Sequence, residues 1–190
     1  ITTQPANLTL NAGEQAEFKV VVEGTEPFWF QWLKNGEALT GADTNTLTLS
    51  SVGPLDIADY SVVVTNLAGS ATSQVAHLQV NVPPAITGGP TNLTVVQGTS
   101  GEFAVQTAGT EPLSFRWYKN GLALPGVGTN VLSLVNLQPR DAGLYWVAVT
   151  NVAGAIESSK ALLTVLTPPF ITDPPTNLVV NAGEKAEFSV

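Results

Sequence analysis

The sequence predicts an all-β protein that consists of β-sandwich domains arranged in tandem. Ile1, Ile86 and Ile171 open three copies of one pattern, spaced 85 residues apart. Within each copy, short segments alternate apolar and polar residues, which is the two-residue period of a β-strand. Gly, Pro and Asn separate these segments, and no stretch shows the apolar spacing of a helix. Repeated short strands with regular turns are typical of a sandwich.

The first copy contains a series of strand patterns that can be placed in order. They cover residues 8–10, 16–22, 28–32, 47–49, 60–64 and 76–80. Between the third and fourth patterns, Asn35-Gly36 indicates a two-residue turn with positive φ at both positions, the usual turn of a β-hairpin. Residues 66–69 form a second turn signal. We expect about seven strands in each complete copy.

Proline pairs mark the boundaries between the copies. Pro83-Pro84 and Pro168-Pro169 fix φ and remove two amide donors, so a strand ladder must stop at each pair. We therefore expect domain 1 at residues 1–83, domain 2 at 84–168 and the first two strands of a third copy at 169–190. Proline-rich joints are semi-rigid spacers, so the domains are expected to lie end to end.

Composition excludes several classes of function. The chain has no cysteine, no methionine and one histidine, His77, which argues against thiol chemistry and against a metal site. The net charge is -8 with only seven basic residues, so nucleic acid is not an expected partner. No apolar run approaches the roughly 20 residues that cross a bilayer, and we expect no membrane insertion in this segment and no cofactor. The early end of the third copy indicates a segment of a longer protein.

The repeated residues carry a family resemblance. In the first copy they are Gly13, Phe18, Val22, Gly24, Trp32, Asp56, Tyr60, Val64, Asn66 and Gly69. In the second copy they are Gly98, Phe103, Gly109, Trp117, Asp141, Gly143, Tyr145, Val149, Asn151 and Gly154. This pattern resembles immunoglobulin-like domains of the intermediate set, which implies a Greek-key sandwich of two sheets.

The resemblance assigns structural roles to several of these residues. Tyr60 and Tyr145 match the tyrosine corner, whose hydroxyl bonds to backbone upstream. Valines stand where the family has its inter-sheet cysteines. They are Val20 and Val62, then Val105 and Val147, with Val190 in the third copy. No arginine precedes Leu47 or Leu132, where many members of this family have one that pairs with the aspartate of the tyrosine turn. We therefore expect Asp56 and Asp141 to accept local backbone N–H bonds.

The cysteine-free tandem copies are similar to immunoglobulin-like repeats of bacterial surface and secreted proteins. That resemblance implies an extracellular or cell-surface location. The implied role is a non-enzymatic stalk, spacer, adhesion or filament module whose partners are neighbouring repeats, other protein subunits or glycans. The remaining alternative is that the domains are accessory parts of a large secreted enzyme.

A candidate partner-binding face follows from strand alternation. Trp29 and Leu33 have the opposite parity to the core residues of the first copy, and Arg116, Tyr118 and Trp146 have it in the second. Aromatic residues beside arginine are typical of interface hot spots or sugar-stacking surfaces. The alternative is that these are isolated surface side chains without a role.

Catalytic and calcium sites are weaker interpretations. Asp43 and Asp59 of the first copy are replaced by Gly128 and Leu144 in the second, so a calcium site would not define the module. His77 lies in a strand pattern with no glycine-rich elbow around a serine, which argues against a hydrolase triad. The sequence therefore predicts no catalytic residues.

Overall fold

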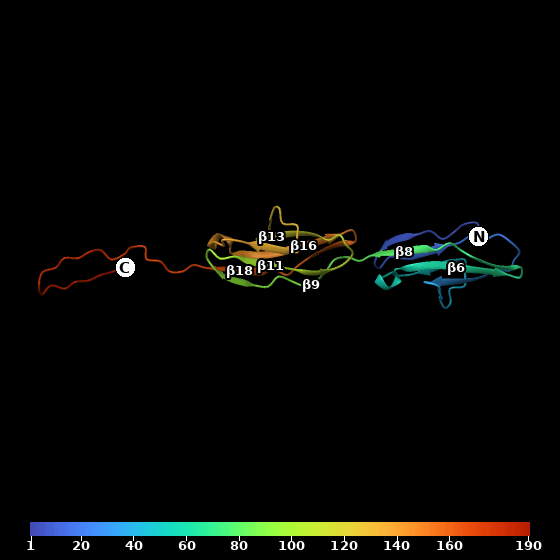
Figure 1. Cartoon of the computed structure of the whole chain (residues 1–190), viewed down its shortest axis with the longest axis horizontal. Coiled ribbons are helices and arrows are strands. Elements are labelled where there is room, and N and C mark those ends of the chain that lie inside the picture. Colours follow the sequence, from blue (N-terminus) through green and yellow to red (C-terminus); the bar gives the residue numbers. More distant parts are fainter.

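The computed structural model describes residues 1–190 and contains two β-sandwiches joined end to end, with residues 167–190 continuing beyond the second one (Figure 1). The predicted fold class, a tandem of all-β sandwiches, is confirmed. No helix is long and apolar enough to span a membrane.

Domain 1 has eight strands and one short 3-10 helix. They are β1 (Leu8–Asn11), β2 (Ala16–Lys19), β3 (Trp29–Lys34), β4 (Glu37–Ala38), β5 (Thr46–Leu49), η1 (Pro54–Asp56), β6 (Ala58–Asn66), β7 (Gly69–Thr72) and β8 (Ala76–Asn81). One sheet has the order β1-β8-β6-β3-β4, with β7 also paired to β6, and β2 pairs with β5 in the other. The first and last strands of the domain, β1 and β8, run parallel.

Domain 2 repeats this arrangement with ten strands and one 3-10 helix. They are β9 (Ala85–Gly88), β10 (Leu93–Val96), β11 (Gly101–Ala104), β12 (Gln106–Ala108), β13 (Ser114–Lys119), β14 (Leu122–Ala123), β15 (Val131–Leu134), η2 (Pro139–Asp141), β16 (Gly143–Asn151), β17 (Gly154–Glu157) and β18 (Ala161–Leu166). Its larger sheet has the order β10-β18-β16-β13-β14. The smaller pairs are β11 with β15 and β9 with β12.

The Asn-Gly turns form as predicted. Asn35 and Gly36 have φ of 50° and 86°, and Asn120 and Gly121 have φ of 49° and 91°. Both central residues of each turn are thus in the positive-φ region that suits the twist of a two-residue hairpin. The turns join β3 to β4 and β13 to β14.

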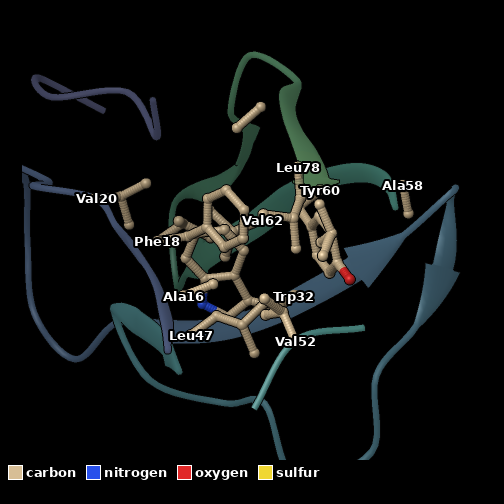
Figure 2. Packing of buried hydrophobic residues seen from close by; sticks show 13 residues of the cluster. Ala16, Phe18, Val20, Trp32, Leu47, Val52, Ala58, Tyr60, Val62 and Leu78 are labelled. Carbon is tan, nitrogen blue, oxygen red and sulfur yellow. The ribbon is translucent and has the colours of Figure 1, made fainter. Parts of the chain in front are cut away.

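The core of each domain is built around one tryptophan. In domain 1, the Phe18 ring stacks on Tyr60 at 4.9 Å between centroids and lies 6.2 Å from Trp32 (Figure 2). The Trp32 indole N–H donates to the Thr44 carbonyl at 2.9 Å, which satisfies its only polar atom. Domain 2 repeats both the stacking and the indole bond.

The four valines at the family's cysteine positions are buried in these cores. Their exposed fractions are 0% for Val20 and Val62, 1% for Val105 and 0% for Val147. They lie in the same two clusters as Trp32 and Trp117. Close-packed valine therefore occupies the space between the sheets.

Residues 167–190 form no strand, and every one of these side chains is exposed. The two strands expected here are not formed, because β1 and β2 pair with β8 and β5 in domain 1, and this segment contains no equivalents of those partners. One turn does form: the Glu184 amide donates to the Asn181 carbonyl at 3.1 Å, as Glu14 does to Asn11. That residues 169–190 begin a third copy stays a prediction.

Candidate functional site

The one histidine of the chain pairs with a carboxylate on the surface of domain 1. His77 Nδ1 lies 2.9 Å from the carboxylate of Asp59, and both side chains are about half exposed. No three acidic or histidine side chains come together in a way that could hold a metal ion. Specific side-chain contacts occur at three other places: the tyrosine corners, the outer face of the larger sheet and the joint between the domains.

The tyrosine corners have the structural role expected of them. The Tyr60 hydroxyl donates to the Asp56 carbonyl at 3.0 Å, and the Tyr145 hydroxyl donates to the Asp141 carbonyl at 2.7 Å. Burial, together with the nearby Asp141 carboxylate, raises the pKa of Tyr145 to about 12. Burial also raises the pKa of Tyr60, and the Lys34 ammonium partly offsets that effect. Both hydroxyls therefore stay protonated and hold the turn that precedes β6 or β16.

A lysine that the family pattern does not include completes each corner. The Asp56 and Asp141 carboxylates accept the local backbone N–H bonds that were predicted, at 3.0 and 2.9 Å. In addition, Lys34 Nζ lies 3.3 Å from Asp56, and Lys119 Nζ lies 3.7 Å from Asp141. Each ammonium also donates, at 2.8 Å, to the backbone carbonyl of the residue directly before the aspartate, which is Leu55 or Arg140. The repeated Lys-Asn-Gly was the available signal, because its lysine stands directly before the hairpin turn.

Trp146 lies on the outer face of the larger sheet of domain 2, but the expectation that it is exposed is wrong. Its ring stacks on Tyr118 with centroids 5.3 Å apart and planes 9° apart. Lys160 Nζ lies 4.8 Å from the centroid of the Trp146 ring. Only 9% of Trp146 is exposed, and its indole N–H has no hydrogen-bond partner. The Tyr118 ring and the Lys160 ammonium thus both lie against the Trp146 ring and help to bury it.

Arg116, on the same face, borders an open groove of about 640 Å³. The groove lies between strands β13 and β16 and the loop 124–128. The Arg116 side chain is exposed and has no acidic partner within 4 Å. In domain 1 the equivalent residue is Gln31, whose amide donates to the Leu39 carbonyl at 2.8 Å and ties the strand to the loop. A cation facing an open groove is therefore a feature of domain 2 alone.

The five residues of the predicted face do not form one surface. Trp29 is 51% exposed at the start of β3, whereas Leu33 is half-buried near its end. In Figure 1 the loop that follows β4 in domain 1 and its counterpart in domain 2 project from opposite sides of the rod. Trp29 and Leu33 thus lie in a different site from Arg116, Tyr118 and Trp146. Whether any of these residues binds a partner stays a prediction.

The joint between the domains is held by hydrogen bonds for which the sequence carries no local signal. The Val82 amide donates to the Thr110 hydroxyl at 2.8 Å, and the Thr110 amide donates back to the Val82 carbonyl at 3.0 Å. The Asn151 side-chain amide donates to the same carbonyl at 2.7 Å. It also donates to the Thr110 carbonyl at 2.8 Å. Two loops of domain 2 therefore hold the last residue before Pro83.

Close packing accompanies these bonds. A Cβ on Gly109 would lie 3.0 Å from the Pro83 carbonyl oxygen and from the Pro84 Cα, and the φ of Gly109 is 136°, so any other residue would be strained at this position. Gly109, Thr110, Ala153 and Gly154 are partly buried, whereas their counterparts in domain 1 are exposed. We call this set of contacts, from Val82–Pro84 to the loops of Thr110 and Asn151, the joint clamp.

Comparison with known proteins identifies both domains. Residues 1–80 match the family described as Immunoglobulin I-set domain, and residues 83–151 match the family described as Immunoglobulin domain. The first match agrees with the predicted intermediate-set resemblance.

Similar proteins are much longer than this chain. Muscle M-line assembly protein unc-89 of Caenorhabditis elegans is 34% identical over 203 residues, which is 96% of this chain and 2% of that protein. Human Hemicentin-1 is 32% identical over 193 residues, which is 93% of this chain and 3% of that protein. The solved I-band fragment I67-I69 from titin is 25% identical with a TM-score of 0.71, covering 92% of this chain and 68% of the fragment. These relatives are animal proteins, so the predicted resemblance to bacterial repeats is not supported.

Proposed function

Because the chain is a tandem of immunoglobulin domains, we propose that it is a non-enzymatic structural module whose two domains form a stiff rod within a larger structural or adhesion protein. The expected partners are neighbouring immunoglobulin repeats. The proposed location of this larger protein is extracellular or at the cell surface. The alternative location is a muscle assembly, because one relative is named as a muscle M-line assembly protein.

The joint clamp is the observation that carries this proposal. Bending at Val82 would break the three hydrogen bonds between this residue and Thr110 or Asn151. At about 1 kcal/mol for each bond, a bent joint would be populated at roughly one per cent or less. Pro83 and Pro84 add to this stiffness because their φ angles are fixed. A joint of this kind transmits force and orientation from one domain to the next.

The experiment is to measure NMR relaxation of backbone amides in both domains. We expect the unaltered chain to tumble as one elongated body, and Asn151→Ala to give the two domains separate, faster tumbling. Asn66→Ala is the matched control, because Asn66 makes the same bond to Thr25 at 2.9 Å but does not touch the joint. Independent tumbling in the unaltered chain would contradict the proposal.

A second candidate function is the capture of an acidic ligand on domain 2. The observation that favours it is the unpaired Arg116 beside the open groove. Arginine binds carboxylates through two parallel hydrogen bonds, which suits an acidic sugar or an acidic side chain. A glycan array with Arg116→Gln as the control tests this function. Equal or absent signals for the two proteins would argue against it.

A further inference from the structure

Both domains carry the acceptor motif for N-linked glycans at the same place. The motif is an asparagine, any residue except proline, and then a serine or threonine. It occurs as Asn7-Leu8-Thr9 in domain 1 and as Asn92-Leu93-Thr94 in domain 2, and nowhere else in the chain. At the next equivalent position, Asn177-Leu178-Val179 keeps the asparagine but has no hydroxyl. The asparagine and the threonine of the motif therefore need separate explanations.

Strand alternation turns both motifs outward. Asn7 stands directly before β1, and Asn92 stands directly before β10. Leu8 and Leu93 pack against the cores, whereas the asparagine and the threonine on either side of each leucine are exposed. Both β1 and β10 lie at an edge of the larger sheet, so no further strand of that sheet flanks them. A bulky group on either asparagine would therefore extend into solvent.

A backbone hydrogen bond fixes the orientation of each asparagine side chain. The His77 amide donates to Asn7 Oδ1 at 2.8 Å, and the Leu162 amide donates to Asn92 Oδ1 at 2.8 Å. Because the partner is a donor, the atom that faces it is the oxygen and not the nitrogen. Nδ2 of each residue makes no hydrogen bond in the chain, whereas Nδ2 of Asn151 is bonded in the joint clamp. The nitrogen that would carry a glycan is thus free in both domains.

The threonine hydroxyl of each motif has no partner in the fold. Thr9 and Thr94 pair through their backbones with Gln79 and Thr164, and their hydroxyls make no hydrogen bond in the chain. A β-branched residue suits a strand with or without a hydroxyl, and Val179 stands at the equivalent position after domain 2. The bond to the neighbouring strand accounts for each asparagine. It does not account for the hydroxyl, which is the group that completes the acceptor motif.

We propose that Asn7 and Asn92 carry N-linked glycans. The proposal rests on the extracellular or cell-surface location given above, because the secretory pathway supplies both the transferase and the donor, an oligosaccharide on a lipid pyrophosphate. In the transfer, Nδ2 forms a bond to the anomeric carbon of the first sugar and loses one proton. The bond from that carbon to the pyrophosphate oxygen breaks, and the lipid pyrophosphate leaves with the electron pair.

The fold can keep its contacts after this modification. A glycosylated Nδ2 retains one hydrogen, and Oδ1 still accepts the bond from the His77 or Leu162 amide. Neither asparagine contributes to the joint clamp. The two glycans would therefore occupy the same edge of each sandwich without altering the contacts between the domains.

Secretion of the whole chain from cultured animal cells tests the two sites. Peptide N-glycosidase removes N-linked glycans and converts each occupied asparagine to aspartate, which peptide mass spectrometry locates. We expect this conversion at Asn7 and Asn92 in most molecules and none at Asn177, which serves as the internal control. The same treatment of chain made in the bacterial cytoplasm should convert none of the three.

Substitution of the threonines separates glycosylation from folding. Thr9→Val and Thr94→Val should each abolish the glycan of their own domain only, because the transferase requires the hydroxyl. Thr9→Ser and Thr94→Ser keep the hydroxyl and are the matched controls, which should retain both glycans. The valine changes remove no hydrogen bond of the chain, so the unglycosylated variants should melt at the same temperature as the unaltered chain.

The natural protein supplies the second measurement. Peptides that contain Asn7 or Asn92, taken from the protein in its source organism, should also be converted by the glycosidase. The proposal is overturned if either asparagine stays unmodified during secretion, if the valine variants keep their glycans, or if both peptides of the natural protein are unmodified. The last result would also count against the extracellular location. The stiffness of the joint is measured on unglycosylated chain, so the rod and the glycans can fail separately.

Discussion

Replacing Tyr145 with phenylalanine removes one hydroxyl group from the core of domain 2. This hydroxyl donates to the Asp141 carbonyl at 2.7 Å, and the side chain is 2% exposed. Loss of a buried hydrogen bond that leaves its acceptor in place costs about 1–2 kcal/mol. We expect Tyr145→Phe to lower the free energy of unfolding of domain 2 by this amount at neutral pH.

The same substitution should change how the stability of domain 2 depends on pH. Burial, with Asp141, raises the pKa of Tyr145 to about 12 in the folded domain, whereas an unfolded tyrosine has a pKa of about 10. The stabilisation is therefore complete below about pH 10 and is lost as the pH rises towards about 12, because the unfolded chain releases the proton first. A difference of about two pKa units corresponds to roughly 2–3 kcal/mol. The phenylalanine variant has no such proton to lose.

Urea unfolding at several pH values, followed through NMR signals of each domain, measures both effects. The two stability curves for domain 2 should converge above pH 10 and cross before pH 12. Tyr60→Phe, the equivalent change in domain 1, is the control and should leave domain 2 unaffected. A difference between the unaltered chain and Tyr145→Phe that stays constant across this pH range would refute the reasoning.

The remaining predictions concern stability and strand positions. Trp117→Ala should lower the free energy of unfolding of domain 2 by about 3–5 kcal/mol. Trp146→Ala should lower it by about 2 kcal/mol, well above the usual effect of a surface substitution, because the Trp146 ring is covered. Chemical denaturation compares the two variants, and a cost near zero for Trp146→Ala would show that its burial is unimportant. Val20→Cys with Val62→Cys should form a disulfide and raise the melting temperature, which thiol titration and calorimetry will measure. Free thiols in the folded protein would show that the two positions do not face each other. A chain that ends at Leu166 should unfold as cooperatively as the longer one, and a large loss of stability would mean that the exposed residues contribute contacts.

Much of the fold could be predicted because its signals are local. Asn35-Gly36 specifies a turn through its own φ preferences, and the parity of Trp32 with its neighbours indicates which face of the strand is buried. The same reasoning placed Tyr60 in a structural role, which its bond to the Asp56 carbonyl confirms. Each of these inferences depends on residues close together in the sequence.

The predictions that went wrong, or were not made, depend on contacts across the chain. Parity placed Trp146 on the outer face correctly, but Tyr118 of β13 and Lys160, which stands directly before β18, cover its ring. Asn151 appeared only as a turn residue, although it reaches Val82, 69 positions earlier. A repeat shows which residues recur but does not show which of them touch the neighbouring domain.

The distance between the two domains tests the central claim, a stiff joint, most directly. The chain has no cysteine, so single cysteines introduced for the exposed Glu17 and Glu102 would carry spin labels at unique sites. Pulsed electron spin resonance on dilute protein should give one narrow distance distribution for the unaltered joint and a broad one when Asn151→Ala is added. A distribution that is equally broad with and without Asn151→Ala would contradict the claim that the joint clamp holds the domains in a rod.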